Sequence, residues 1–417
     1  MKIHILTIGD EILIGQTLNT NAAFIGELLN NNNYSISSTS VVGDNVKQIA
    51  DEIDKSLKHN DIVLCTGGLG PTNDDVTLHA ITEVFKTELV ENEEILNDIK
   101  LFFEKRNRKL TEINKQQALV PKIAIPIKNF HGTAPGVWIQ KDKKIFAAMP
   151  GVPLEMKAMM EDFILPKIIE NMPSKFIKKP TTLLTTGIPE SFLYEEIKTI
   201  DGIVEKGNLA FLPSQFGVKI RITAIDKVES IVNERIFEVE QQIRSKVGRY
   251  IYGKDNQTLE EVVGKLLKER GLTLAVAESC TGGLISSRIT NVSGSSKYFE
   301  RSIITYSNGA KVELLGIDED LINKYGSVSL EVARLMAEGI KAVSGTDIGL
   351  AVTGIMGPTG ATENKPVGLV YIGICDDKVC TAKEFRFGDN RLLNKDRTSQ
   401  AALEMLRRNL LGISYDQ

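Results

Sequence analysis

The sequence predicts a mixed α/β protein with an N-terminal three-layer α/β domain, a small α+β domain and a C-terminal α/β domain. Its 417 residues, at about 150 residues per domain, predict about three domains. Patterns typical of buried strands alternate with helical patterns at both ends of the chain. Proline-containing segments at 171–174 and 178–180 are typical of a linker. We therefore place the domains at residues 1–170, 171–254 and 255–417.

The composition is that of a soluble globular protein, with 42% hydrophobic and 25% charged residues. A formal net charge of −4 argues against general nucleic-acid binding. No apolar run reaches the length of about 18 residues that a membrane helix needs, so we expect a cytoplasmic protein without a membrane partner. The cysteines form no C-x-x-C pair, and we expect all four to be reduced: Cys65, Cys280, Cys375 and Cys380.

The first domain alternates apolar runs with amphipathic stretches. Strands are predicted at 3–8 and 61–66, and helices around 24–29, at 76–85, at 95–103 and after Pro153. Strands that are separated by helices favour parallel pairing through right-handed crossovers, which predicts the three-layer arrangement.

A glycine-rich loop at 67–71 follows the second of these strands and precedes a helix. Its backbone N–H groups and the helix N-terminus suit an anion such as phosphate. The loop is not a P-loop, because no Gly-Lys-Ser/Thr follows, and it lacks the third glycine of the dinucleotide fingerprint.

Two carboxylate pairs stand at strand ends of the same domain. They are Asp10 with Glu11, and Asp74 with Asp75. Either pair alone is better explained as a turn or a helix cap. Both pairs together, at the carboxyl ends of presumed neighbouring strands, predict a site where a hard divalent cation bridges carboxylates and anion.

The middle segment predicts a small α+β domain. Its expected strands are 181–186, 209–212 and 218–225, and its expected helices are 190–199 and 228–247. An RNA-binding KH domain would clamp the backbone with a G-x-x-G loop, but Gly202 and Gly207 are separated by four residues. We therefore expect a spacer or dimer-forming role and a homodimeric protein.

The third domain predicts a nucleophile at the end of a strand. After a helix at 259–269 and a strand at 272–277, the segment Glu278–Gly283 places Ser279 and Cys280 at a helix N-terminus, where the dipole favours anionic intermediates. All four histidines precede residue 132, so a neutral lysine is the available base for a serine. Lys311 follows a strand at 302–306 and is the natural choice if burial lowers its pKa, with Tyr306 as a proton relay.

Two further segments of this domain suit substrate binding. A glycine-rich loop after a strand at 348–352 suits an oxyanion hole or a phosphate contact, and another strand is predicted at 368–375. Arg391, near the start of the last helix, is a candidate phosphate ligand. The alternative is that Ser279 only caps its helix, Lys311 is a solvated surface lysine and the loop is an ordinary connection.

These motifs resemble the competence/damage-inducible protein (CinA) family, over all three segments and in the same order. The matching residues are 9–13, 66–75, 149–153, 277–283, 306–308 with Lys311, 353–358 and 365–368. The resemblance implies a molybdopterin-binding fold, a KH-like middle domain and a C-terminal nicotinamide-nucleotide amidase. It departs at Met356, where the family usually has alanine, and at Arg391, which is shifted by one residue.

The resemblance also implies two activities. The C-terminal domain would convert nicotinamide mononucleotide to nicotinate mononucleotide and ammonia without a cofactor, and the N-terminal domain would hydrolyse ADP-ribose with a divalent metal, Co²⁺ or Mg²⁺. The implied catalytic residues are Ser279, Lys311, Tyr306 and Thr353. The implied substrate-binding residues are Thr281, Gly282, Gly283, Gly354, Gly357 and Arg391, and in the first domain Gly67, Gly68, Gly70 and Thr72. Asp10, Glu11, Asp74 and Asp75 would hold the metal.

Three hypotheses follow. The first is an enzyme of pyridine-nucleotide salvage with both activities. The second keeps only the amidase, with the first domain a nucleotide- or pterin-binding regulatory module. The third is a nucleic-acid-associated factor in competence or DNA damage, which the net charge disfavours.

Overall fold

The computed structural model describes residues 1–72, 75–200 and 208–414. These residues form two compact units. The first unit comprises residues 1–179 and 225–232, and the second comprises residues 180–224 and those from 233 onward. Within the described ranges, no helix combines the length and the apolar character that crossing a membrane requires.

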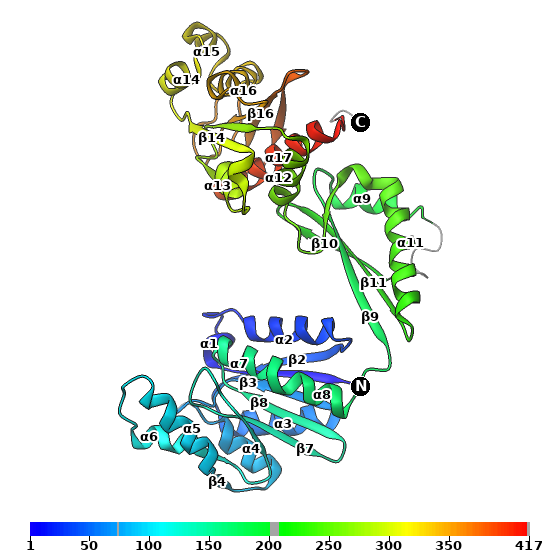
Figure 1. The fold of residues 1–417 in the computed structure, drawn as a ribbon, viewed down its shortest axis with the longest axis vertical. Coiled ribbons are helices and arrows are strands. Elements are labelled where there is room, and N and C mark those ends of the chain that lie inside the picture. Colours follow the sequence, from blue (N-terminus) through cyan, green and yellow to red (C-terminus); the bar gives the residue numbers. More distant parts are fainter. Residues whose placement is uncertain (73–74, 201–207, 415–417) are drawn as a thin grey trace. The chain divides into compact units, whose positions relative to one another are not determined.

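The first unit is built on a six-stranded sheet with the order β2-β1-β3-β8-β7-β6 (Figure 1). The strands are β1 (Ile3–Ile8), β2 (Ile36–Val42), β3 (Ile62–Thr66), β6 (Ile125–Ile127), β7 (Gly136–Lys141) and β8 (Lys144–Met149). The pairs β1–β2, β1–β3 and β3–β8 are parallel, as predicted. The strand β7, which we did not predict, is antiparallel to both β8 and β6, because a tight turn joins β7 to β8.

Helices cover both faces of this sheet, which confirms the three-layer prediction (Figure 1). Ile3 and Ile5 of β1 belong to one apolar core, and Leu6 and Ile8 belong to the other, so the strand is buried on both sides. The first core includes α2 (Thr20–Asn31), α7 (Pro153–Met159) and α8 (Leu165–Asn171), and the second includes α3 (Val46–His59) and α4 (Thr77–Phe85). The remaining elements are α1 (Asp10–Leu13), β4 (Leu89–Glu91), α5 (Glu93–Glu104), α6 (Glu112–Lys115), β5 (Leu119–Pro121), a 3-10 turn (Gln116–Ala118) and a π-helix (Met160–Ile164).

The middle module has a four-stranded sheet with the order β10-β11-β9-β12. Its elements are β9 (Ile177–Thr185), α9 (Glu190–Ile197), β10 (Asn208–Ser214), β11 (Gly217–Asp226), α11 (Glu229–Val247) and β12 (Ile251–Lys254). A short 3-10 turn (Gly248–Tyr250) precedes β12. Gly202 and Gly207 lie outside the described residues.

The C-terminal module has a five-stranded sheet with the order β14-β13-β15-β16-β17. The strands are β13 (Leu274–Glu278), β14 (Phe299–Ile304), β15 (Ile348–Gly354), β16 (Leu369–Cys375) and β17 (Cys380–Arg386). Three strands are parallel, and β16 and β17 add an antiparallel edge. One apolar core includes α12 (Leu259–Arg270), α13 (Leu284–Thr290) and α17 (Arg391–Leu411), and the other includes α14 (Asn308–Leu315), α15 (Glu319–Tyr325) and α16 (Leu330–Ser344).

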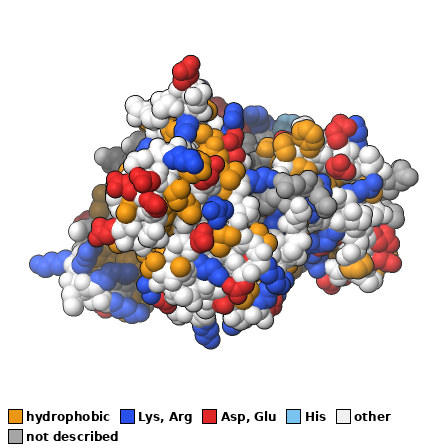
Figure 2. Space-filling view, turned by 90° about the horizontal axis from the view of Figure 1, so that it is seen from above, with side chains coloured by type: hydrophobic (Ala, Val, Ile, Leu, Met, Phe, Trp, Pro, Cys, Tyr) orange, Lys and Arg blue, Asp and Glu red, His pale blue; other side chains and the backbone are white. Residues whose placement is uncertain are grey.

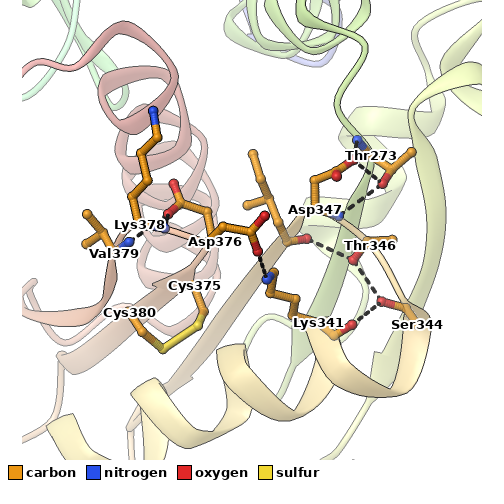
Figure 3. Close-up of polar contacts among 12 residues, drawn as sticks. Thr273, Lys341, Ser344, Thr346, Asp347, Cys375, Asp376, Lys378, Val379 and Cys380 are labelled. Atoms are coloured by element: carbon orange, nitrogen blue, oxygen red, sulfur yellow. Dashed lines mark hydrogen bonds and ion pairs between the residues drawn. A yellow bond between two sulfur atoms is a disulfide. The ribbon is translucent and has the colours of Figure 1, made fainter.

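The prediction of four reduced cysteines is wrong for two of them. Cys375 and Cys380 form a disulfide between the last residue of β16 and the first residue of β17 (Figure 3). They face each other across this antiparallel hairpin with their Cα atoms 4.0 Å apart, a pairing that spacing in the sequence does not reveal. Cys65 and Cys280 are free and buried.

Candidate functional sites

The first candidate site lies where the parallel strands β13, β14 and β15 end. In open α/β sheets, ligands bind at this carboxyl edge. The segment after β13 is the Ser279 loop (residues 278–283), the segment after β14 is Thr305–Ser307, and β15 leads into 354–358. The structure therefore brings three sequence-predicted motifs to one edge of the sheet.

Ser279 and Lys311 meet at this edge. Lys311 Nζ lies 3.4 Å from Ser279 Oγ, although the two residues are 32 positions apart in the sequence. Both residues are buried, with 8% of Ser279 and 1% of Lys311 exposed. Lys311 lies in the first turn of α14, whose N-terminus is capped by the Ser307 hydroxyl, so the position of the lysine is fixed by the helix start.

Burial lowers the pKa of the Lys311 ammonium below its usual value. The carbonyl oxygens of Thr305 and Ser307 lie 2.8 Å and 3.4 Å from Lys311 Nζ and accept hydrogen bonds from it. A neutral amine has two N–H groups and one lone pair. In its charged form Lys311 Nζ donates to Ser279 Oγ as well, whereas a neutral amine that donates both N–H groups to the carbonyls keeps its lone pair for Ser279 Oγ, as a general base requires.

Cys280 is the neighbouring candidate nucleophile, and its surroundings disfavour the reactive thiolate form. Burial raises the pKa of its thiol to about 12. A thiol with this pKa stays protonated near neutral pH and is a poor nucleophile. The electrostatic environment therefore favours Ser279 over Cys280.

Glu278 organises the Ser279 loop, a role that we did not predict. Its side chain is fully buried and accepts hydrogen bonds from the backbone N–H groups of Gly283, Ile285 and Ser286. The hydroxyls of Thr281 and Ser286 also donate to it. The start of α13 is thus occupied by the chain's own carboxylate, so this helix N-terminus does not offer these amides to an anionic intermediate, contrary to our expectation.

The other backbone N–H groups of the loop differ in whether they are free to bind an oxyanion. Gly282 N–H donates to the Ser279 carbonyl, and Ser279 N–H donates to the Val352 carbonyl. The Cys280 N–H interacts with the sulfur of its own side chain, whereas the described hydrogen bonds include no acceptor for the Thr281 N–H. The side chain of Thr281 itself is engaged with Glu278, so only its backbone is free to bind a ligand.

Arg391 joins the loop after β15 to the strand end after β14. One of its terminal nitrogens donates to the Gly357 carbonyl at 2.9 Å and the other to the Tyr306 hydroxyl at 3.1 Å. Tyr306 is 63% exposed, and its hydroxyl is directed at Arg391. Among the described contacts, Tyr306 makes no hydrogen bond to Lys311, so the structure places it beside a cation and not in a proton relay.

Two other predicted residues lie in packed positions. The Thr353 hydroxyl is buried and donates to the Ser327 carbonyl, 2.8 Å away. A Cβ at Gly354 would lie 2.7 Å from the Val370 side chain, so this glycine allows close packing of β15 against β16. The described hydrogen bonds do not join Thr353 to Ser279 or Lys311.

The second candidate site is a cavity of about 520 Å³ in the first unit. The glycine loop lines it through Gly67, Gly68 and Gly70. Gly67 has a φ of 115°, and a Cβ there would lie 2.1 Å from the Ile8 carbonyl oxygen. Only glycine allows this close passage between β1 and β3, which brings the backbone of the loop to the cavity.

The predicted metal ligands are only partly brought together. Glu11 and Asp75 line the cavity, whereas Asp10 does not, and Asp74 lies outside the described residues. Asp75 already accepts hydrogen bonds from the backbone N–H and the hydroxyl of Thr72. No cluster of three or more His, Cys, Asp or Glu side chains among the described residues is suited to a metal ion. The described residues alone do not assemble a metal site, and the prediction, which includes Asp74, stays a prediction.

Three titratable residues of the cavity were missed in the sequence: Asp44, His131 and Glu155. Glu155 lies in the first turn of α7, two residues after Pro153, and accepts a hydrogen bond from the Asn129 side chain at 2.7 Å. Burial raises the pKa of the Glu155 carboxyl. The motif at 149–153 could have indicated Glu155, because the first turn of the helix that follows the motif carries this carboxylate to the cavity.

Fold and sites together define a three-module protein. The molybdopterin-binding domain family matches residues 4–170, the KH domain family of damage-inducible protein CinA matches residues 180–253, and the CinA C-terminal domain family matches residues 256–410. A relative from Caldicellulosiruptor saccharolyticus, described as a competence-damage inducible protein, is 43% identical over 412 residues, which cover 99% of this chain and 100% of the relative. A CinA-like protein from Kosmotoga olearia is 41% identical over 413 residues, with the same coverage.

The chain therefore belongs to the competence-damage inducible protein (CinA) family. Solved structures of single family domains are also similar. A CinA protein from Thermoplasma acidophilum is 36% identical, with a TM-score of 0.37. The match covers 40% of this chain and 96% of the chain of that protein. A family protein from Agrobacterium tumefaciens is 37% identical, with a TM-score of 0.36, and covers 37% of this chain and 93% of its own.

Proposed function

We propose that the C-terminal module is an amidase that converts nicotinamide mononucleotide to nicotinate mononucleotide and ammonia. The observation that carries the proposal is the buried Ser279–Lys311 pair, with its 3.4 Å separation and a lysine whose pKa burial lowers. A serine with an amine base is suited to acyl transfer, and no metal is needed for that chemistry. The substrate follows from the resemblance to the family's nicotinamide-nucleotide amidases.

The reaction proceeds in two acyl-transfer steps. Ser279 Oγ attacks the carboxamide carbon, and its proton passes to Lys311 Nζ. The C–N bond then breaks as Lys311 returns this proton to the leaving nitrogen, so ammonia departs and a nicotinoyl ester remains on Ser279. Water attacks the ester and gives a proton to Lys311, which delivers it to Ser279 Oγ as the ester bond breaks. The Thr281 N–H is the donor of this loop that is available to the oxyanion.

Ammonia release from nicotinamide mononucleotide by the full chain tests the proposal. Ser279→Ala and Lys311→Met are each expected to lower kcat at least about 1,000-fold, because both act as one unit. Cys280→Ala is the matched control and is expected to retain activity within about tenfold. Circular dichroism of each variant checks that it is folded. Activity that survives in Ser279→Ala and is lost in Cys280→Ala would overturn the assignment.

A second candidate function is hydrolysis of ADP-ribose in the first unit. The cavity of about 520 Å³ is lined by the glycine loop and by Glu11 and Asp75; it is large enough for part of a nucleotide and combines anion-binding backbone with carboxylates. We expect a divalent metal to bind together with the diphosphate, whose oxygens would add to the carboxylate ligands.

AMP release from ADP-ribose with Mg²⁺ or Co²⁺ tests this second function. The Ser279→Ala chain is the right enzyme for the assay, because it lacks the proposed amidase and keeps the first unit intact. Glu11→Gln is expected to reduce AMP release at least about tenfold. If no metal supports AMP release by the unaltered chain, the first unit is a binding module only.

A further inference from the structure

A cavity of about 450 Å³ within the second unit is separate from the candidate active site. The middle module supplies part of its lining from the end of β9 and the start of β11, and the C-terminal module supplies part from α12, α13 and α17. Ser279, Lys311 and Arg391 are not among the described residues that line it. Its volume is typical of sites that bind small molecules.

Gln400 of α17 lines this cavity and carries an amide donor without an acceptor. The residue is only 4% exposed, and its Nε2 atom is buried without a hydrogen-bond partner in the described chain. Its Oε1 atom accepts a hydrogen bond from Arg288 Nη2 at 2.9 Å. The amide therefore cannot be reversed without turning its own N–H groups toward a guanidinium that only donates. A buried donor without an acceptor is destabilising, and beside a cavity it indicates that a ligand supplies the missing acceptor.

A hydrogen-bond acceptor lies on the same face of α17 as this donor. Asp396 precedes Gln400 by four residues, a spacing that places side chains about 5–6 Å apart on one helix face, and it also lines the cavity. Among the described contacts, the Asp396 carboxylate accepts one long hydrogen bond, from Gln215 Nε2 at 3.5 Å. The two residues together offer a donor next to an acceptor, which matches a ligand edge that carries a carbonyl beside an N–H group.

Two aromatic side chains give the cavity surfaces for a flat ring. Phe216, in the turn between β10 and β11, is 37% exposed, and Tyr252 of β12 is half-buried. Both residues line the cavity. The guanidinium carbon of Arg288 lies 5.6 Å from the centre of the Phe216 ring, which places this ring of the middle module beside the C-terminal module. Aromatic side chains in such a lining favour a planar ligand.

The charges around the cavity argue against an anionic ligand. The guanidinium of Arg288 is neutralised by the carboxylate of Glu260, 2.7 Å away. Of the other charged residues in the described lining, Asp255 and Asp396 are acidic and only Lys219 is basic. An anion would therefore be repelled by the acidic side chains, whereas an uncharged compound would not be.

We propose that this cavity binds an uncharged planar compound whose edge carries a carbonyl beside an N–H group. The carbonyl would accept a hydrogen bond from Gln400, and the N–H group would donate one to Asp396. The ring would pack against Phe216 and Tyr252. Nucleobases and aromatic carboxamides share this chemistry. The site is independent of the proposed amidase, because it uses none of the residues of that mechanism.

Calorimetric titration of the full chain with four compounds tests this site. Uridine carries the proposed edge on a nucleobase, and benzamide carries it on an aromatic carboxamide. In 3-methyluridine and N,N-dimethylbenzamide, methyl groups replace the N–H hydrogens. We expect uridine, benzamide or both to bind with a Kd below about 1 mM, and the methylated form of each binding compound to bind at least about tenfold more weakly, because the hydrogen bond to Asp396 is lost. Binding of uridine alone identifies a nucleobase site, and binding of benzamide alone identifies a carboxamide site.

Variants of the lining locate the bound compound. Gln400→Glu keeps the size of the side chain and an acceptor for Arg288 but removes the donor, and we expect it to weaken binding at least about tenfold. Phe216→Ala, at an exposed position, is expected to weaken binding about threefold or more. The control is Gln241→Glu, an exposed residue of α11 outside the lining, which is expected to leave binding unchanged.

Thermal unfolding of each variant checks that it is folded. If the unaltered chain bound neither uridine nor benzamide, the proposal would be wrong. Equal binding by the unaltered chain and by Gln400→Glu would place the compound elsewhere and would also overturn it. Should Gln400→Glu fail to fold, unchanged binding by Phe216→Ala would have the same consequence.

Discussion

In the proposed mechanism, burial at position 311 allows a lysine to act as the base in place of a histidine. In water a lysine is almost fully protonated near pH 7, and its ammonium has no lone pair to accept a proton. The side chain of Lys311 is removed from solvent and surrounded by carbonyl oxygens and a hydroxyl, with no carboxylate bonded to it among the described contacts. The surroundings of this one side chain therefore determine whether it can accept a proton from Ser279.

The pH profile of the proposed amidase reaction tests this point. Since burial lowers the pKa of Lys311, and since only its neutral form acts as a base, kcat/KM is expected to rise with pH through a half-point below about 10, the usual range for lysine. Ammonia release measured between pH 5 and pH 10.5 gives the profile. A half-point at the usual lysine value, or activity that falls as pH rises, would contradict this role.

Glu278 determines the shape of the Ser279 loop rather than its chemistry. Glu278→Ala leaves three N–H groups without this acceptor, one buried and two half-buried, and we expect it to lower the free energy of unfolding by at least about 3 kcal/mol. Urea denaturation followed by circular dichroism measures the loss. Glu300→Ala removes an exposed carboxylate from the neighbouring β14 and is expected to change stability by less than about 0.5 kcal/mol. Equal effects of the two variants would refute the anchoring role.

At the scale of the elements, both candidate sites lie at the carboxyl ends of parallel strands. β1 and β3 lead into Glu11 and the glycine loop, and β13 and β14 lead into Ser279 and Lys311. These elements were predictable, because continuous apolar runs that end in glycine or polar residues are typical of buried parallel strands.

What the sequence did not predict depends on contacts between distant segments. The antiparallel strands β7 and β16 resemble parallel ones in their apolar pattern, and only their partners reveal the direction. The Cys375–Cys380 disulfide depends on that hairpin register. Gln400 is one of many polar residues of a long helix, and its place beside a cavity appears only when the two modules of the second unit pack together.

The close passage at Gly67 gives a prediction for the first unit. Gly67→Ala forces a Cβ against the Ile8 carbonyl at a φ of 115°, and we expect a loss of about 1–3 kcal/mol in the unfolding free energy of this unit. Gly26→Ala, inside α2 with only a side chain 3.4 Å away, is expected to be neutral or stabilising by up to about 1 kcal/mol. Thermal unfolding of both variants decides; a neutral Gly67→Ala would contradict the packing argument.

The whole molecule combines two compact units, each with its own apolar cores. Its surface carries charges of both signs: in Figure 2 acidic and basic side chains intermingle on the face that is drawn. With a formal net charge of −4, this is consistent with small anionic ligands at local sites rather than a nucleic-acid backbone along one surface.

The stabilisation of each unit by its ligand tests whether the two proposed sites lie in separate units. In the Ser279→Ala chain, nicotinamide mononucleotide at 100 times its Kd is expected to stabilise the second unit by about 2.7 kcal/mol and to leave the unfolding of the first unit unchanged. ADP-ribose is expected to act on the first unit alone. Differential scanning calorimetry resolves the two transitions, and a ligand that raised both equally would show that the sites are not assigned to separate units.

The most direct test of the central claim is to find the acyl group during turnover. The full chain is mixed with nicotinamide mononucleotide, quenched in acid, digested and examined by mass spectrometry, with Lys311→Met in parallel. We expect the nicotinoyl nucleotide ester on the peptide that contains Ser279, located on Ser279 itself, and its absence from the Lys311→Met chain. An adduct located on Cys280, or an equal yield of ester without Lys311, would contradict the Ser279–Lys311 mechanism.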